Sequence, residues 1–162
     1  MDFFAHLAWS YIIFGKFVGL DQLIQILFFS VLPDLIWGIP AFFVFVWSKI
    51  KTGKGRLLIH EREGWIRSLY YSSHSFVSIF ILFAISSVLT KSIYTPLVYG
   101  WGLHLLFDMF LHKGTLGNKP LYPLGYKIDG LIHWKNKKFL IISWVLIAFL
   151  FSVFFLLRPP FN

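Results

Sequence analysis

Long apolar runs, separated by short polar segments, make up most of the chain. They predict five helices, over about residues 3–16, 23–47, 68–90, 97–112 and 139–157. The last run holds 19 residues without a charge, which is enough to span a bilayer. The sequence therefore predicts an all-α, polytopic membrane helix bundle of about five helices, forming a single integral-membrane domain over residues 1–162.

The first two predicted helices are irregular. The first is short, and it follows Asp2 without the basic segment that begins a signal peptide. The second contains Pro33 and Pro40, and a proline inside a helix removes a backbone hydrogen bond. We expect this helix to be broken at Pro33. Such breaks are tolerated at membrane depth where they line a cavity enclosed by protein, and the residue after this one is Asp34.

The composition supports a membrane protein. Hydrophobic residues make up 57% of the chain and charged residues only 14%, compared with about 25% charged in an average protein. A soluble fold of 162 residues has too high a surface-to-volume ratio to bury so much apolar side chain. The same apolar content excludes a disordered chain. The absence of cysteine excludes a disulfide scaffold, thiol catalysis and thiolate metal ligands.

The basic residues are unevenly distributed along the chain. The net charge is +8, from 15 Lys and Arg against 7 Asp and Glu, and in a soluble protein it would suggest nucleic-acid binding. Twelve of the 15 basic residues instead fall in two polar loops, at 48–67 and 113–138. Because basic loops stay on the cytoplasmic side of a membrane, we expect both loops to be cytoplasmic. The expected partners are membrane lipids, and no nucleic acid is expected.

Five ionisable residues stand inside apolar runs, where they need an explanation. An aspartate near the centre of a membrane helix costs about 2.5–3.5 kcal/mol to insert. Both aspartate and histidine bind metal ions, and ionisable residues within a membrane are candidates for function by default. The five are His6, Asp34, His74, His104 and Asp108.

The sharpest local pattern is the segment GWGLHLLFDMFLH, which carries His104, Asp108 and His112 at four-residue intervals. On a helix these side chains share one face, and a histidine and a carboxylate one turn apart can bind one ion. His112 lies about 12 Å along the axis from His104, too far to share that ion, at 1.5 Å per residue. It would serve a second ion through Asp108 or contact a substrate. Imidazole and carboxylate ligands suit zinc, manganese or iron.

The same residues allow other interpretations. His104 and Asp108 could hydrogen-bond each other inside the bundle without any ion. An ion-coupled membrane transporter, or a non-catalytic metal-binding membrane protein, would use the same buried set. An intramembrane aspartyl protease would use Asp34 and Asp108 as a pair, but the Gly-x-Gly-Asp context expected for it is missing. His60 and His133 lie in polar loops and are interpreted as solvated.

The ordered set of motifs resembles the small inner-membrane metal-dependent hydrolase family, with distant similarity to the zinc-dependent phospholipase C fold. The resemblance covers about residues 1–134 and implies a bacterial-type inner membrane. It also implies one or two divalent ions, because the histidine and glutamate that complete a third site in the phospholipase pattern are absent from the last helix. The motifs are His6, Leu32-Pro33-Asp34, His74-Ser75, His104-x-x-x-Asp108, His112, Gly114 and Leu121-Tyr122-Pro123-Leu124.

The resemblance also implies roles for these residues. The metal ligands would be His6, Asp34, His74, His104 and Asp108, with His112 matching a family variant and Asp129-Gly130 resembling a further short element. The ion would activate a water for attack on a phosphoester or similar bond of a small molecule or lipid. Asp34 or Asp108 would act catalytically by orienting or deprotonating that water. Basic residues near the site would attract phosphate-bearing lipids, namely Lys113, Lys119 and Lys127.

Overall fold

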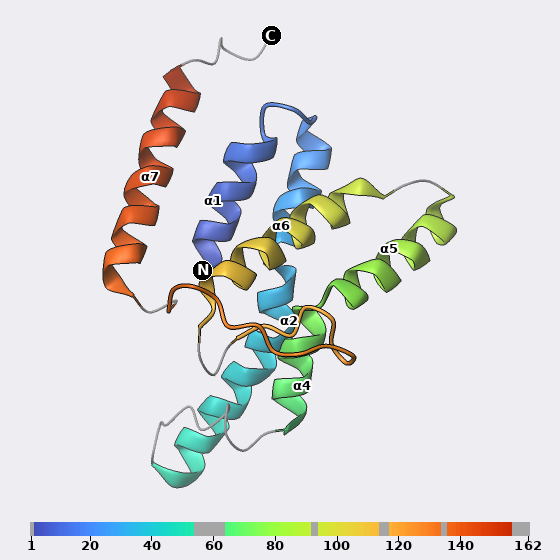
Figure 1. Ribbon diagram of the computed structural model, residues 1–162, viewed down its shortest axis with the longest axis vertical. Helices are drawn as coiled ribbons and strands as arrows, with labels where there is room; N and C mark the ends of the chain where they lie inside the picture. Colours follow the sequence, from blue (N-terminus) through green and yellow to red (C-terminus); the bar gives the residue numbers. More distant parts are fainter. Residues whose placement is uncertain (1, 54–63, 92–93, 114–116, 134–135, 157–162) are drawn as a thin grey trace.

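The computed structural model describes residues 2–53, 64–91, 94–113, 117–133 and 136–156 (Figure 1). Within these residues it contains α-helices and no strand, apart from one isolated bridge between Asn118 and Ile128. The predicted all-α fold class is therefore confirmed. The helices are α1 (Phe3–Phe14), α2 (Leu20–Thr52), α4 (Gly64–Ser73), α5 (Phe76–Thr90), α6 (Thr95–Leu111) and α7 (Lys137–Leu156).

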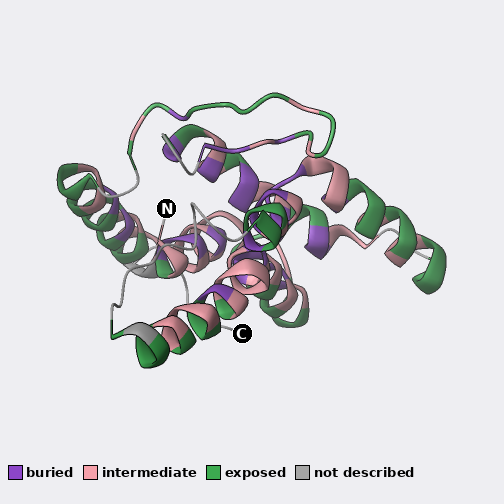
Figure 2. Cartoon of the chain, turned by 90° about the horizontal axis from the view of Figure 1, so that it is seen from below, coloured by how far each residue is buried: buried purple, intermediate pink, exposed green. Residues whose placement is uncertain are grey.

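Helix α2 is the centre of the bundle. It packs against α1, α4 and α6, while α5 packs on α6 and α7 packs on α1. The segment 117–133 crosses the bundle at the level where α4 gives way to α5 (Figure 1). Buried residues gather toward the middle of the bundle, and the outlying helices are largely exposed (Figure 2). Side chains from several elements therefore meet at one central level.

Two helices are long and apolar enough to cross a membrane. They are Leu20–Lys51 within α2 and Lys137–Phe154 within α7. Most of the residues in these two segments are not buried inside the protein. Helices α4 and α5 are long and apolar enough to cross a membrane only when they are taken together, and this pair is bent by 63°. These helices support insertion in a membrane with two spans, or three if the bent pair is one span. They do not establish the five spans that the sequence suggested.

Helix α2 is continuous, and the expected break at Pro33 is wrong. Both Pro33 and Pro40 lie inside one helix that ends at Thr52. A proline removes one backbone hydrogen bond, but packing against neighbouring helices keeps such a helix intact in apolar surroundings. Gly53 caps the end of the helix, and its φ of 66° is a left-handed conformation that glycine adopts without strain.

The single helix expected over residues 68–90 is instead two helices with a bend at His74 and Ser75. Ser75 is extended and caps α5, because its hydroxyl oxygen accepts a hydrogen bond from the Val77 N–H. The same hydroxyl donates to the carbonyl oxygen of Tyr122 at 2.9 Å. The Trp101 indole donates to the Ser73 carbonyl at 2.8 Å. The bend is thus held from both sides, by the 117–133 segment and by α6.

Candidate metal centre

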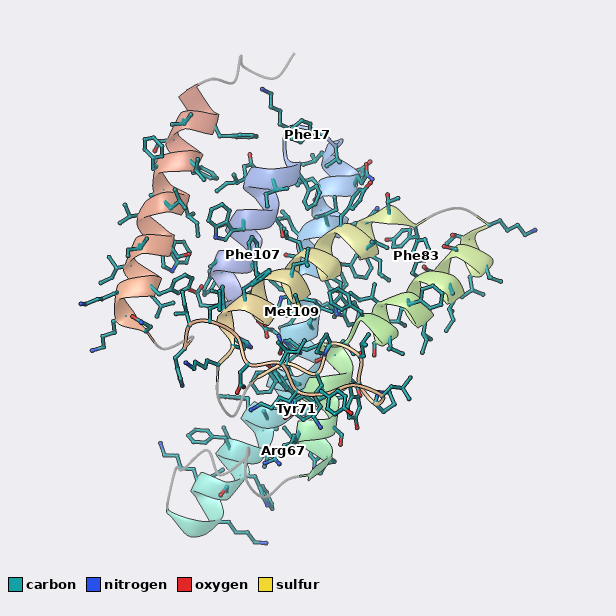
Figure 3. The ribbon with its side chains drawn as sticks, in the orientation of Figure 1. Phe17, Arg67, Tyr71, Phe83, Phe107 and Met109 are labelled. Carbon is teal, nitrogen blue, oxygen red and sulfur yellow. The ribbon has the colours of Figure 1, made fainter. Side chains whose placement is uncertain are left out.

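Three elements bring two aspartates and two histidines together. Helix α2 carries Asp34, the bend between α4 and α5 carries His74, and α6 carries His104 and Asp108. One possible ligand atom from each residue lies within 4.8 Å of the other three. We call these residues the four-residue group. Figure 3 shows side chains crowded together in the middle of the bundle, between the labelled Met109 and Tyr71.

The separations within the four-residue group suit one tetrahedral ion. His104 Nε2 lies 3.2 Å from His74 Nε2, and Asp108 Oδ2 lies 3.2 Å from His104 Nε2 and 3.4 Å from His74 Nε2. Asp34 Oδ1 lies 3.6 Å and 3.8 Å from the same two nitrogens. Ligands bound tetrahedrally to zinc at about 2.0–2.1 Å are about 3.3 Å apart. These five separations are near that value, and the ligand oxygens of the two carboxylates lie within 4.8 Å of each other, so the four atoms could surround one ion.

Backbone carbonyls fix which nitrogen of each histidine carries the proton. His104 Nδ1 lies 2.7 Å from the Ser30 carbonyl oxygen, and His74 Nδ1 lies 3.0 Å from the Tyr70 carbonyl oxygen. Because a carbonyl oxygen can only accept, both Nδ1 atoms must donate. Nε2 is then the nitrogen that each ring turns toward the carboxylates and toward the other ring. This is how metal-binding histidines are usually oriented.

The two carboxylates of the four-residue group need a positive charge close to them. His74, His104 and Asp108 are buried, each with at most 1% of its surface exposed. Two carboxylates this close together repel each other, and burial of unpaired charge is costly. One shared proton would balance only one of the two carboxylates. A divalent cation would balance both and would accept all four lone pairs.

Asp34 is the most accessible member of the group. Its side chain is 20% exposed, and Oδ1 accepts a hydrogen bond of 3.3 Å from the Trp37 indole. Asp108, by contrast, is fully enclosed. Water or a substrate would therefore approach the group from the side of Asp34.

His6 and His112 meet the other oxygen of Asp108. His6 Nε2 on α1 lies 3.2 Å from Asp108 Oδ1, and His112 Nε2 lies 3.5 Å from the same atom. The His6 ring also stacks on the ring of His104, with centroids 3.8 Å apart. The structure thus gathers five of the candidate residues named from the sequence around the carboxylate of a sixth, Asp108. It also places His112 beside Asp108 rather than in the four-residue group, as its spacing from His104 requires.

His112 lies just beyond the end of α6 and is neutral. Burial lowers the pKa of its ring to about 3. Its Nδ1 lies 2.9 Å from the Tyr70 hydroxyl, which in turn donates to Asn118 Oδ1 at 2.8 Å. Tyr70 therefore touches two histidines, His74 through its carbonyl and His112 through its hydroxyl.

Asp129 is not brought into this cluster. Its Oδ1 lies 3.1 Å from the Lys127 ammonium, and both side chains are substantially exposed. The neighbouring Gly130 is closer to the site, because its N–H donates to the His112 carbonyl at 2.9 Å. His133 is exposed. His60 lies outside the described residues.

Three residues that contact the histidines, directly or in the case of Asn118 through Tyr70, were missed by the sequence analysis. Ser30 acts through its backbone carbonyl and Asn118 comes from a distant segment, so neither leaves a local pattern. Tyr70 did leave one, because it stands four residues before His74 and so shares its helix face. A polar aromatic side chain at that spacing could have been recognised as a partner.

Comparisons with protein-family models, with curated proteins and with solved structures give no match for this chain. The likeness to inner-membrane hydrolases therefore stays an expectation from sequence motifs. The geometry of the histidine and aspartate cluster carries the functional argument.

Proposed function

We propose that the protein is a membrane-embedded metal-dependent hydrolase whose divalent ion is held by the four-residue group. One observation carries the proposal: two buried histidines, each with Nδ1 held by a backbone carbonyl, turn Nε2 toward two carboxylates, and one possible ligand atom from each of the four residues lies within 4.8 Å of the others. Zinc is the preferred ion because four nitrogen and oxygen ligands at these separations suit its tetrahedral geometry. Manganese or iron would use the same ligand types.

The two aspartates would have different roles. A divalent ion bound there would lower the pKa of a water to about 7 and polarise the scissile bond. Asp34 is 20% exposed, so it can orient or deprotonate an incoming water when it is not fully used as a ligand. Asp108 is enclosed by histidines and would hold the ion in place. The proposed reaction is therefore hydrolysis, with Asp34 as the residue nearest to the incoming water.

The proposed substrate is a phosphoester of a lipid or of a small molecule. Lys113 directly follows His112 and is exposed, and Lys119 lies 4.8 Å above the Tyr71 ring. Lysines at this level of the bundle would attract phosphate groups. The basic segments 48–67 and 113–138 favour an opening toward the cytoplasmic face of a bacterial-type inner membrane.

An ion-coupled transporter or a non-catalytic metal-binding protein is the alternative. The observation in its favour is the burial of His74, His104 and Asp108, which suits a carried or structural ion as well as a catalytic one. Neither alternative requires a partly exposed carboxylate beside the ion. The partly exposed carboxylate of Asp34 is therefore the feature that favours the hydrolase over these two alternatives.

The experiment compares turnover with transport. The purified protein is loaded with zinc and assayed for phosphodiester and phospholipid hydrolysis in detergent, and the same preparation is assayed for ion flux in liposomes. We expect hydrolysis that is lost on chelation and in Asp34→Asn but kept in His133→Ala, a control at an exposed loop histidine. Flux without hydrolysis would favour the transporter. Bound zinc with neither activity would favour the non-catalytic protein.

A further inference from the structure

We infer that residues 117–133, which connect α6 to α7, lie in the headgroup layer of the membrane, with the side chains of Leu124, Tyr126 and Leu131 immersed in lipid. The sequence alone indicated only a basic loop on the cytoplasmic side. The inference requires that α7 is inserted in a membrane, and it does not depend on the proposed function. The partner is the phospholipid of the bilayer that surrounds the helices.

The segment 117–133 presents large apolar side chains away from the rest of the protein. Tyr126 is 92% exposed and Leu124 is 86% exposed, and among the described residues no large hydrophobic side chain is more exposed than these two. Leu131 is 77% exposed. Figure 2 shows the segment along one side of the bundle, with long exposed stretches. Apolar side chains gathered on a surface indicate contact with a partner or a membrane.

Hydrogen bonds hold the backbone of the segment against the bundle. Near its start, the carbonyl of Pro120 accepts from the Phe76 N–H at 2.8 Å. Near its end, the Leu131 N–H donates to the Phe110 carbonyl at 2.8 Å. The backbone is thus fixed at both ends, to α5 and to α6. The apolar side chains between these points therefore project outward from a defined position.

The start of α7 sets the depth of the segment in the membrane. Helix α7 has 20 residues, and a helix of that length spans the hydrocarbon core of about 30 Å. Its first residue, Lys137, then lies near one membrane surface, only four residues after His133. Four residues reach at most about 14 Å. In Figure 1 the segment lies level with the lower end of α7, which is where this helix begins.

The residue types of the segment match the headgroup layer. Tyrosine is enriched where hydrocarbon meets water, because its ring is apolar and its hydroxyl is polar. Lysine can bury its methylene groups and extend its ammonium group to the phosphates. Residues 113–133 contain three lysines against one acid, Asp129. This balance favours a surface that contains acidic phospholipids.

The same segment contacts the cluster of histidines and aspartates. Asn118 accepts a hydrogen bond from the Tyr70 hydroxyl at 2.8 Å, and the Gly130 N–H donates to the His112 carbonyl at 2.9 Å. With residues 117–133 among the headgroups, the cluster stands near the membrane surface rather than at the centre of the bilayer. A phosphate group in a lipid headgroup would already be close to that level.

The test measures the depth of single cysteines, since the chain has none of its own. Leu124→Cys and Tyr126→Cys replace exposed side chains, so both should fold, which circular dichroism checks. Each full-length variant is labelled with the fluorophore nitrobenzoxadiazole and placed in nanodiscs of phosphatidylcholine and phosphatidylglycerol. Two exposed residues give the reference depths. Lys51→Cys, at the end of α2, reports on water, and Val145→Cys, in the middle of α7, reports on the hydrocarbon core.

The expected result is a depth between those of the two reference positions. At Leu124→Cys and Tyr126→Cys, the emission should shift to shorter wavelength than at Lys51→Cys, and quenching by aqueous iodide should be largely lost. Lipids with a nitroxide near the headgroup should quench both labels more strongly than lipids with a nitroxide at the chain end. Val145→Cys should show the opposite order.

Four results would overturn the inference. Iodide quenching at both positions as strong as at Lys51→Cys would place the segment in water, and stronger quenching by chain-end nitroxides would place it in the hydrocarbon core. Protection from iodide without quenching by any nitroxide lipid would indicate a protein partner, such as a second copy of the chain. Absence of nitroxide quenching at Val145→Cys would remove the span that sets the depth. None of these signals requires a bound ion or hydrolysis, so failure of the inference leaves the proposed hydrolase function standing.

Discussion

His74 and His104 bring their Nε2 atoms to 3.2 Å from each other, although the Nδ1 atom of each ring is already bound to a backbone carbonyl. Where neither Nε2 carries a proton, the two rings present lone pairs to each other. The contact is favourable only when positive charge lies between the rings and the carboxylates beside them. This relationship makes the metal centre the most economical explanation of the cluster.

The two aspartates should differ in how strongly they support zinc binding. Asp108 is buried and contacts the four histidines of the cluster, which are His6, His74, His104 and His112. Asp34 contacts only His74 and His104 among these four and is 20% exposed. A ligand present at about 100 times its dissociation constant stabilises a protein by about 2.7 kcal/mol. Thermal unfolding in detergent should therefore show a zinc-dependent rise that is reduced in Asp34→Asn and absent in Asp108→Asn. An undiminished rise in Asp108→Asn would show that zinc binds elsewhere.

A pair of glycines on α6 tests how closely that helix must approach α2. A Cβ on Gly100 would press against the Ile26 carbonyl and lie 2.9 Å from Ser30 N, whereas a Cβ on Gly102 meets nothing within 4 Å. Gly100 stands one turn before His104, whose ring is held by the Ser30 carbonyl. Gly100→Ala should therefore cost about 1–3 kcal/mol of stability and weaken zinc binding, because the helices must separate.

Gly102→Ala is the matched control for Gly100→Ala. It should be neutral or stabilising by up to about 1 kcal/mol, because alanine favours a helix. Unfolding and zinc titration would be measured on both variants. Equal effects of the two substitutions would argue against close approach of α6 and α2 as the cause.

The cap at Ser75 should control the position of His74. Its hydroxyl accepts from the Val77 N–H and donates to the Tyr122 carbonyl. Ser75→Ala leaves both groups without that partner and should cost about 0.5–2 kcal/mol, the usual cost of losing a helix cap. Zinc affinity should fall with stability, because the bend also carries His74. Ser86→Ala, which removes a hydroxyl that donates to the Phe83 carbonyl within α5, provides the control. Normal zinc affinity in Ser75→Ala would uncouple the bend from the site.

The membrane orientation can be measured by labelling single cysteines, since the chain has none of its own. Lys51 at the end of α2 and Lys91 at the end of α5 are both exposed. We expect Lys51→Cys to react with an impermeant reagent only after the cells are opened, and Lys91→Cys to react in intact cells. Labelling of Lys51→Cys from outside would reverse the proposed orientation.

Much of the fold and of the cluster could be predicted from local sequence patterns. Apolar runs predicted the helices, and the spacing of His104, Asp108 and His112 placed them on one face. The continuity of α2 through Pro33 could not be predicted, because helix packing outweighs the local effect of proline. The bend at Ser75 depends on Tyr122, which is 47 residues away. Long-range partners of this kind leave no periodic signal.

The central claim is that a divalent ion sits between His74, His104, Asp34 and Asp108. X-ray absorption at the zinc edge tests it most directly, applied to the purified wild type and to His104→Ala. We expect wild-type ligands at about 2.0–2.1 Å that are nitrogen and oxygen, with the outer-shell scattering of imidazole rings, and a loss of the ion or of part of that scattering in the variant. A wild type that retains no zinc, or a spectrum unchanged in His104→Ala, would contradict the claim.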